Sequence, residues 1–277
     1  MLQTGRMLHK RYTIQQIAEH GGDYLVYAAE DQRTGKNVLV KETIFQSSSF
    51  ARQFEFEARL LATLRHPSLP VVIDYFVDSE GHYLVMEHVP GQSLSAFLAS
   101  QPNKRLTEHT ARMIIDPLID VLAYLHNHEP PIIHRNIHPD HIRLHRQIYL
   151  VNFGIAKAYS PTEMTTIGAL SVNPGFSPIE QYGATSTDAR SDLYAFGATI
   201  YLMLTGVKTT PALQRVPVDP LKPVCSLNAE ISASMERVYI DCSKYKWRIA
   251  TRILPVYSGI WQPLTVERAR RLHPGCL

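Results

Sequence analysis

Four short segments constrain this chain of 277 residues more than its composition does. A lysine closes the apolar run 38–41, and an asparagine closes the run His134-Arg135-Asn136. Another asparagine opens the segment 152–154, and Asp192 ends an Arg-Ser-Asp triplet. Each segment alone is short enough to occur in unrelated proteins. Their order and spacing have to be explained together.

The first third of the chain has the pattern of a small sheet, and most of the remainder is helical. Alternating apolar segments between turn residues predict strands at 24–29, 37–41, 71–77 and 82–88. A 3,4,3 spacing of apolar residues predicts one helix over 50–65. The break at 89–91 is the expected linker, and helical spacing follows at 94–100, 109–126 and 192–204.

Taken together, the segments resemble the signature set of the protein kinases, in particular the bacterial Hanks-type serine/threonine kinases. The catalytic-loop stretch 132–142 is the most specific part of the likeness. The resemblance implies an α+β class and a two-lobed protein kinase-like fold. Residues 12–88 would form an N-lobe of small antiparallel β-sheet with one helix, and 92–242 a mainly helical C-lobe.

On the nucleotide side, the stretch 17–27 resembles the glycine-rich loop whose backbone closes over phosphates. Gly21 keeps one motif glycine, whereas Glu19 stands at the first glycine position and Tyr24 at the third. The resemblance also implies that Val26, near the end of this stretch, contacts the nucleotide. The carboxylate of Glu19 brings unfavourable negative charge toward phosphates. An ordinary hairpin with a Gly-Gly turn is the alternative interpretation.

Lys41 matches the lysine that binds the first two phosphates, and Glu57 matches the glutamate on the helix that pairs with this lysine. Taken alone, such a pair can also be two solvated charges. Leu39 replaces the alanine usual against the adenine ring, and overpacking of this size costs ~1–3 kcal/mol. Backbone groups of Glu87 and Val89 would read the adenine. ATP is therefore a candidate ligand with weakened affinity.

In the catalytic loop the resemblance places the general base at Asn136, the phosphate counter-charge at His138 and a metal ligand at His141. An active kinase would carry Asp, Lys and Asn there. Asn136 cannot accept a proton, which typically costs about 10²–10⁴ in rate, and His138 is a weaker counter-charge than lysine. Asn152 replaces the other metal ligand, so both metal positions lose their usual donors and Mg²⁺ binding is doubtful.

The histidines of this region admit a competing interpretation as a transition-metal site. Their spacings of 4, 3 and 4 residues would converge on a helix in the series His134, His138, His141 and His145. Pro139 argues against a helix there. The kinase resemblance instead gives His134 a core position.

Other residues look structural. Asp192 is expected to begin the long central helix, where a carboxylate suits the helix dipole, and to anchor the catalytic-loop backbone. Asn173 stands where these kinases place a threonine that contacts the base. The pair 165–166 is Thr-Thr, and Arg135 could receive its phosphate charge, although adjacent loop threonines are more often simply solvated. A hydrophobic column linking the lobes would contain Leu61, Val72, His134 and Phe153.

The resemblance stops near residue 239. Glu180 should pair with a late arginine, and no convincing partner follows. The stretch 247–261 mixes Pro, Gly and β-branched residues without helical periodicity. One permitted choice of codons, read in a shifted frame, spells a segment like the missing helix. We therefore interpret 243–277 as an atypical tail, with a frameshift as the hypothesis and a marginally stable lower lobe as its consequence.

Composition narrows the remaining classes. The net charge of +3 is small and the basic residues are scattered, which gives nucleic-acid binding no support. No apolar run is long enough to span a bilayer, and the start lacks the apolar core of a secretion signal, so the cytoplasm is the expected location. The three cysteines show no metal-binding spacing and are expected to be reduced thiols.

The sequence therefore predicts a serine/threonine kinase-type domain that works as a pseudokinase. Such a domain would bind nucleotide weakly or not at all and would act through contacts with a protein partner. The alternatives are a low-activity ATP-dependent kinase that phosphorylates protein substrates and the relic of a damaged gene. Metal-dependent nucleotide binding would favour the kinase, and failure to fold would favour the relic.

Overall fold

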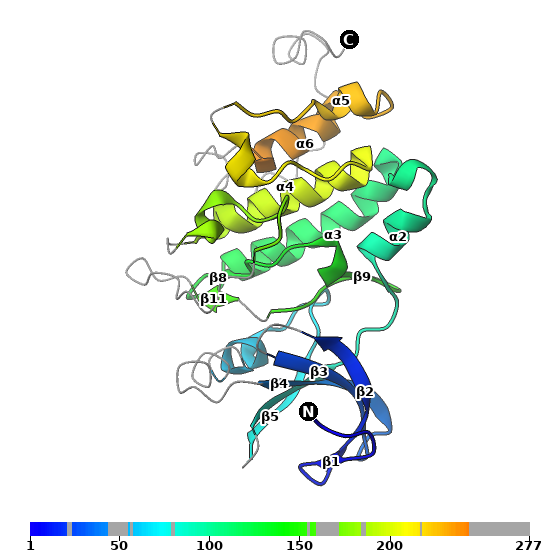
Figure 1. Cartoon of the computed structure of the whole chain (residues 1–277), viewed down its shortest axis with the longest axis vertical. Helices are drawn as coiled ribbons and strands as arrows, with labels where there is room; N and C mark the ends of the chain where they lie inside the picture. The colour runs from blue at the N-terminus through cyan, green and yellow to red at the C-terminus, as the bar shows by residue number, and fades with distance from the viewer. Residues whose placement is uncertain are drawn as a thin grey trace. The chain divides into compact units, whose positions relative to one another are not determined.

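The structure is a computed structural model that describes residues 1–20, 24–43, 55, 58–78, 81–153, 156–158, 172–183, 187–216 and 218–243 (Figure 1). The chain divides into two compact units, Met1–Pro90 and Gly91–Leu277. The expected tail from residue 244 onward lies outside the described residues, as do Gly21, Glu57 and the threonine pair 165–166. Within the described part, no helix has the length and apolar character needed to cross a membrane.

One antiparallel sheet forms the body of the first unit. Its strands are β1 (Met7–Leu8), β2 (Tyr12–His20), β3 (Tyr24–Asp31), β4 (Lys36–Thr43), β5 (Val72–Val77) and β6 (His82–Glu87). They lie in the order β1-β2-β3-β4-β6-β5, with antiparallel neighbours throughout. The four predicted strands are confirmed, and the described part of the predicted helix, residue 55 and residues 58–63, is helical.

The two faces of this sheet differ in their side chains. Successive residues of a strand point to opposite faces, and the register sets Tyr27 opposite Val40 and Val26 opposite Lys41. Tyr27 and Val40 belong to the core cluster, which contains Leu2, Leu8, Tyr12, Ile14, Leu25, Tyr27, Ala29, Val38, Val40, Phe76, Tyr83 and Val85. The other face of β3 and β4 therefore carries Val26 and Lys41.

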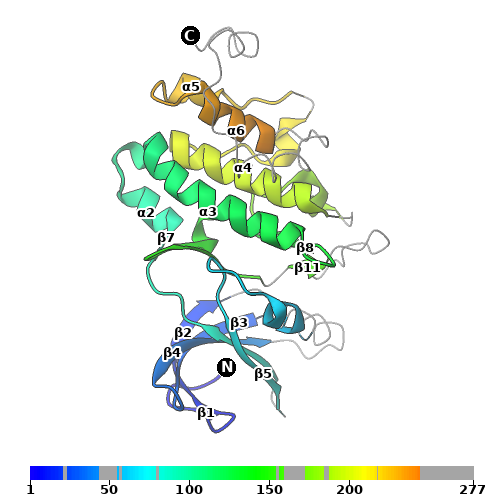
Figure 2. The ribbon, with the colours of Figure 1, turned by 180° about the vertical axis from the view of Figure 1, so that it is seen from behind.

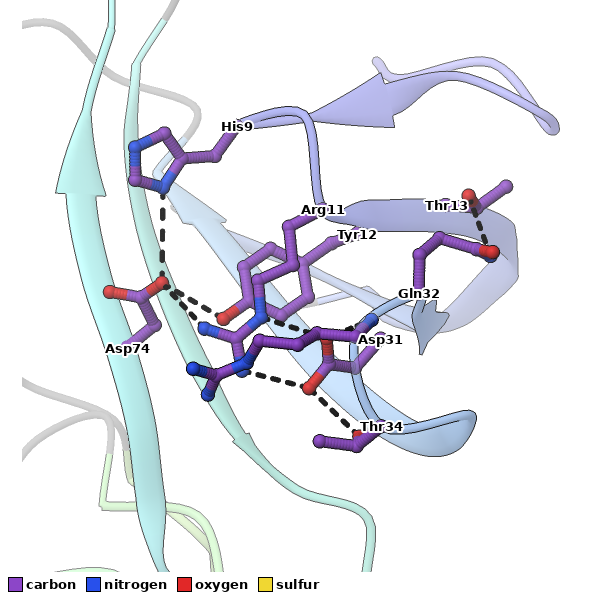
Figure 3. A network of polar contacts seen from close by, with 9 residues as sticks. His9, Arg11, Tyr12, Thr13, Asp31, Gln32, Thr34 and Asp74 are labelled. Carbon is purple, nitrogen blue, oxygen red and sulfur yellow. Dashed lines mark hydrogen bonds and ion pairs between the residues drawn. The ribbon is translucent and has the colours of Figure 1, made fainter.

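A polar network ties the N-terminal segment to the edge of this core (Figure 3). Arg11 donates two hydrogen bonds to the carboxylate of Asp31, at 2.7 and 2.8 Å. Asp31 is 1% exposed, and the Arg11 guanidinium holds the pKa of Asp31 well below its usual range. The Tyr12 hydroxyl donates to Asp74 at 2.8 Å. The network joins the start of β2, the end of β3 and the middle of β5.

Helices dominate the second unit. They are α2 (Leu94–Ser100), α3 (Glu108–His126), α4 (Ala189–Thr205), α5 (Val224–Leu227) and α6 (Ala233–Ser243). α3 and α4 lie side by side in both views (Figures 1 and 2), and α6 packs on α4. Nearly every residue of α4 is buried, which makes it the central helix of this unit. With the sheet of the first unit, this confirms the predicted α+β kinase-like class.

The ends of α4 follow from local chemistry. The helix begins at Ala189 rather than at the predicted Asp192, because the Asp188 side chain caps it by accepting the backbone N–H of Arg190 at 2.8 Å. It ends at Thr205, and Gly206, which follows, has a left-handed φ of 72°. A Cβ atom on Gly206 would lie 2.4 Å from the backbone oxygen of Asn103, so only glycine fits.

Short strands and single 3-10 turns position the loop that resembles the kinase catalytic loop. β8 (Ile132–Ile133) pairs with β11 (Lys157–Ala158), and β9 (Ile142–Leu144) pairs with β10 (Ile148–Leu150) and β7 (Gln92–Ser93). The loop between β8 and β9 contains the turn η2 (Pro139–His141), and Pro139 begins that turn. Among the described residues, the other 3-10 turns are η1 (Pro102–Lys104), η4 (Ile179–Tyr182) and η5 (Ala212–Arg215).

The cysteines differ from expectation in one respect. Cys242, on α6, is a free and buried thiol. Cys225, on α5, is disulfide-bonded, so the prediction of a reduced thiol is wrong at that position. Cys276 lies outside the described residues.

Candidate functional site

The loop between β8 and β9 is anchored by a buried carboxylate at the start of α4. Asp192 accepts the backbone N–H of His134 at 2.8 Å and that of Arg135 at 2.7 Å. It also accepts a hydrogen bond from Nε2 of His126 at 2.8 Å. Burial opposes ionisation, yet the hydrogen bonds from His126 and from the backbone of His134 favour the carboxylate, so the pKa of Asp192 lies below its ordinary value. The predicted anchoring role is confirmed.

Four substituted positions of this unit form one hydrogen-bonded chain. The Asn173 amide donates to Oδ1 of Asn136 at 2.9 Å. Nδ1 of His141 lies 2.9 Å from the backbone oxygen of Asn136, and Nε2 of His141 lies 3.0 Å from Nδ2 of Asn152. Because a carbonyl oxygen only accepts, His141 carries its proton on Nδ1 and its Nε2 accepts the Asn152 amide. The expected base and metal-ligand positions therefore bond to one another.

The backbone suits the residues that take part in this chain. Asn136 is 6% exposed, and its backbone N–H donates to Nδ1 of His134 at 3.2 Å. Asn152 has a φ of 66°, in the left-handed region that asparagine tolerates better than most side chains. The asparagines at 136 and 152 are thus held by their surroundings in defined orientations.

His138 is partly buried, and its Nδ1 lies 3.2 Å from the carboxylate of Asp140. Burial lowers the pKa of His138 to about 4. In keeping with a neutral ring, Nδ1 of His138 accepts the backbone N–H of Asp140 at 3.2 Å. The imidazole meets the ring of Phe176 edge to face, with the centroids 4.4 Å apart. His138 therefore packs as an aromatic side chain.

His134 and His141 also pack against neighbouring rings. His134 is fully buried and meets the ring of Phe153 edge to face, with the centroids 4.5 Å apart. Burial lowers the pKa of His134 to about 4. The rings of His138 and His141 are 5.8 Å apart. Within the part of the chain that the structure describes, no group of three His, Cys, Asp or Glu side chains could hold a metal ion.

The segment around η4 fastens the same loop to α4. Gln181 donates its side-chain amide to the backbone oxygen of Arg135 at 2.7 Å, and the Arg135 side chain is itself buried. Glu180, for which an arginine partner was expected, accepts the hydroxyl of Ser191 at 2.6 Å. Burial raises the pKa of Glu180, although the Ser191 hydrogen bond opposes the shift.

In the first unit, three of the predicted nucleotide-binding residues share one face of the sheet. Val26 lies directly opposite Lys41, and Leu39 precedes Lys41 on the same side of β4. Lys41 is 5% exposed, and its Nζ lies 4.6 Å from the centroid of the Tyr24 ring. The Tyr24 hydroxyl donates to Oε1 of Glu19 at 2.9 Å.

The strand expected to read adenine is β6 and the residues that follow it. Glu87 ends β6, and its backbone N–H donates to the backbone oxygen of Val71 at 2.9 Å. Val89 is buried, with 7% of its surface exposed. The structure therefore gives the backbone N–H of Glu87 a structural hydrogen bond, and the adenine-binding role of Glu87 stays a prediction.

Sequence reasoning missed several of these contacts. It did not find His126 as a partner of Asp192, because the two residues are distant in the sequence and belong to different predicted helices. It recognised the substitution at Asn173 without connecting it to Asn136. It read Tyr24 as a lost glycine and not as a ring over Lys41. The sequence signal that could have revealed these contacts was that several substitutions fall at positions that are neighbours in the kinase fold.

Comparison with known proteins gives a consistent result. The protein kinase domain family matches residues 9–228. A probable serine/threonine-protein kinase of Streptomyces coelicolor is 34% identical over 85% of this chain and 37% of its own length. The serine/threonine-protein kinase PrkC of Bacillus subtilis is 31% identical over 78% of this chain and 32% of its own length. The chain thus spans about a third of the length of these relatives.

Solved structures show the same fold. The structure described as the apo form of PpkA-294 superposes with a TM-score of 0.72 at 23% identity, over 89% of this chain and 94% of that one. The kinase domain of Mycobacterium tuberculosis PknI gives 0.67 at 18% identity, over 88% and 92%. The chain therefore belongs to the protein kinase family, among the bacterial Hanks-type serine/threonine kinases, and has their two-lobed fold.

Proposed function

We propose that this chain is a pseudokinase, a serine/threonine kinase-type domain that acts through protein contacts rather than by phosphoryl transfer. The observation that carries the proposal is the hydrogen-bonded chain from Asn173 through Asn136 and His141 to Asn152. The side chains at the two expected metal positions, His141 and Asn152, bond to each other, and the Asn136 side chain at the base position bonds to Asn173. Such pairing favours a domain that keeps its shape without ligands.

The donor set at the expected metal positions does not fit magnesium. Mg²⁺ prefers oxygen ligands, chiefly carboxylates, in octahedral geometry. Asn152 turns its amide nitrogen toward His141, and Nε2 of His141 accepts that N–H. A metal ion would have to displace this hydrogen bond and would still gain no anionic ligand from either residue. We therefore derive no catalytic step through a metal in this chain.

The groups that would move a proton and balance charge are missing as well. A base at position 136 would accept the proton of the substrate hydroxyl, whereas the amide oxygen of Asn136 already accepts from Asn173. Loss of such a base typically costs about 10²–10⁴ in rate. His138 is neutral and cannot offset the charge of a transferring phosphoryl group. These groups act as a unit, so their costs are not summed.

Nucleotide binding is proposed to be weak. Lys41 keeps its place on the sheet face, beside Val26 and Leu39, and offers one positive charge to a phosphate. The extra carbons of Leu39 narrow the adenine position, and Glu19 adds a negative charge on the phosphate side. The relatives are named serine/threonine-protein kinases, so a protein is the expected class of partner.

A low-activity ATP-dependent kinase is the second candidate, and one observation favours it. The catalytic loop is anchored on Asp192 through two backbone hydrogen bonds, an arrangement that positions a loop for chemistry. A scaffold also needs this anchor, because the loop lies in the core of its unit. The pseudokinase therefore remains the better explanation of the substitutions.

We also propose the extent of the domain. The kinase-like region runs over 12–242, with lobes at 12–88 and 92–242, and α6 ends at Ser243. Residues 243–277 are proposed to be an atypical tail that a frameshift produced. Sequencing the coding DNA tests this, because the absence of a kinase-like alternative frame would remove the idea.

The test of function is thermal unfolding of the purified chain with ATP, in magnesium and in EDTA, combined with phosphate transfer to a generic basic protein. A ligand that binds only the native state must raise the unfolding temperature. The matched variant carries Asn136→Asp, His138→Lys, His141→Asn and Asn152→Asp together, which restores the expected kinase residues.

We expect the chain to unfold cooperatively, with little shift from ATP and no difference between magnesium and EDTA. The fourfold variant should gain a shift that requires magnesium. Magnesium-dependent stabilisation of the unaltered chain, together with phosphate transfer above the level of a Lys41→Met control, would refute the pseudokinase. Failure of the unaltered chain to unfold cooperatively would instead favour the relic.

A further inference from the structure

Two side chains in the first unit stand where the kinase resemblance expects glycines, and they contact each other. The Tyr24 hydroxyl donates to Oε1 of Glu19 at 2.9 Å. Tyr24 begins β3 and Glu19 lies near the end of β2, so the bond joins the two strands. Glycine at these positions would leave the backbone bare. Here a ring and a carboxylate take that space.

The same tyrosine covers Lys41. Nζ of Lys41 lies 4.6 Å from the centroid of the Tyr24 ring, within the range of a cation–π contact. The strand register explains the approach: Glu19, Val26 and Lys41 lie in one row across β2, β3 and β4, and Tyr24 is diagonal to Lys41 on the same face. Lys41 is 5% exposed, although lysine is rarely so buried.

Both contacts compete with a phosphate for the lysine. An ammonium over a ring has given up part of its hydration to the ring face, and a phosphate must draw it away. The Glu19 carboxylate, bonded to the edge of that ring, repels an approaching polyphosphate. Lys41 is thus already engaged by the protein on the side that the proposed nucleotide would use.

We propose that Tyr24 and Glu19 form a built-in cover over Lys41 that excludes the phosphates of a nucleotide. This rests on the proposed function, since it explains why nucleotide binding is weak. The cover acts on the phosphates alone. The adenine end depends on Leu39 and on the strand that ends at Glu87, which the cover does not touch.

A purely structural role for the ring predicts something different. Tyr24 is half-buried and Glu19 is exposed, so neither is required to fill the core cluster, which lies on the opposite face of the sheet. If the ring only stabilised the strand end, its removal would weaken binding of all ligands alike. If it covers Lys41, its removal must favour ligands with phosphates over those without.

The experiment is titration calorimetry of the full chain with ATP and, separately, with adenosine. The variants are Tyr24→Ser, which removes the ring, Tyr24→Phe, which keeps the ring and loses the bond to Glu19, and Glu19→Gln, which removes the charge and keeps an acceptor. Glu30→Gln is the matched control, because it removes one carboxylate from the far end of β3. Circular dichroism at the titration temperature checks that each variant is folded.

For Tyr24→Ser we expect ATP affinity to rise roughly 3- to 30-fold, from the strength of a cation–π contact, while adenosine affinity stays constant. Tyr24→Phe and Glu19→Gln should give smaller gains for ATP, and Glu30→Gln should give none. Three results would overturn the cover. They are unchanged or weaker ATP binding by Tyr24→Ser, an equal rise in affinity for ATP and for adenosine, and no ATP binding in any variant.

The pseudokinase proposal and the cover fail in separate ways. Phosphate transfer by the unaltered chain would refute the pseudokinase, whereas the ratio of ATP to adenosine affinity would still report on Tyr24. If the ratio of ATP to adenosine affinity is the same in all variants, the proposed cover is refuted. The argument from the hydrogen-bonded chain around Asn136 is not affected by that result.

Discussion

Replacing Asp192 with asparagine tests how the catalytic loop is held. Asp192 is 0% exposed and accepts three hydrogen bonds, two from backbone N–H groups and one from His126. Oδ2 accepts from His134 and His126, and Oδ1 accepts from Arg135. An asparagine has one acceptor oxygen, so its NH₂ group must face at least one of these donors.

The cost follows from the bonds that are lost. A hydrogen bond to a charged group contributes about 1.5–3 kcal/mol, and a buried donor left unsatisfied costs about 1–3 kcal/mol more. Removing the buried charge recovers part of this, because an ionised group is costly to bury. We expect Asp192→Asn to lower the free energy of unfolding by about 3 kcal/mol.

The assay is urea unfolding followed by circular dichroism. Asp188→Asn is the control, because Asp188 lies at the cap of the same helix and asparagine caps as well as aspartate does. We expect the control to change stability by less than about 1 kcal/mol, since its pair with Arg190 is partly exposed. Equal losses in the two variants, or a loss below about 1 kcal/mol in Asp192→Asn, would refute the anchor.

Three further predictions concern stability. Burial lowers the pKa of His134 from 6.5 to about 4, so between these pH values the unfolded chain binds a proton that the folded chain does not. The contribution of this group to stability is complete above pH 6.5 and falls toward pH 4, by at most about 3 kcal/mol. In urea titrations at a series of pH values, His134→Phe should make the free energy of unfolding depend less on pH. Gly206→Ala should lower the free energy of unfolding in urea by at least about 2 kcal/mol, because the new Cβ atom would lie 2.4 Å from a backbone oxygen. Gly35 is also left-handed but has open space around it, so Gly35→Ala should lower the free energy of unfolding by only about 1 kcal/mol. Equal losses in the two variants would contradict the clash. Asp31→Asn should lower the melting temperature more than Asp219→Asn, because Asp31 is buried and pairs with Arg11 whereas the Asp219 side chain is 48% exposed. The reverse order in a thermal scan would contradict this.

Sequence reasoning recovered the fold because the kinase segments and the strand and helix patterns agreed with one another. Strands 24–29 and 37–41 were found from alternation, and their true ends lie a few residues further out, where Asp31 and Lys36 close the ladder. The start of α4 was missed, because the cap at Asp188 is a local hydrogen bond and leaves no periodic signal. The disulfide state of Cys225 had no sequence signal at all.

The candidate site was predictable by position but not by interaction. The substitutions at Asn136, His141 and Asn152 were visible as departures from a pattern. That the three residues bond to one another depends on side-chain directions at left-handed and 3-10 backbone positions, which no spacing rule supplies. The low pKa of His138 depends on burial beside Phe176, a residue far away in the sequence.

The hydrogen-bonded chain also bears on how such a domain can evolve. Changing Asn152 alone to aspartate would set a carboxylate against Nε2 of His141, acceptor against acceptor, unless His141 took up a proton. Changing His141 alone would remove the hydrogen bonds that His141 makes with the Asn152 amide and with the Asn136 carbonyl. A single change at Asn152 or at His141 is therefore expected to cost stability. Under the proposed function, selection acting on one substitution at a time would preserve the hydrogen-bonded chain.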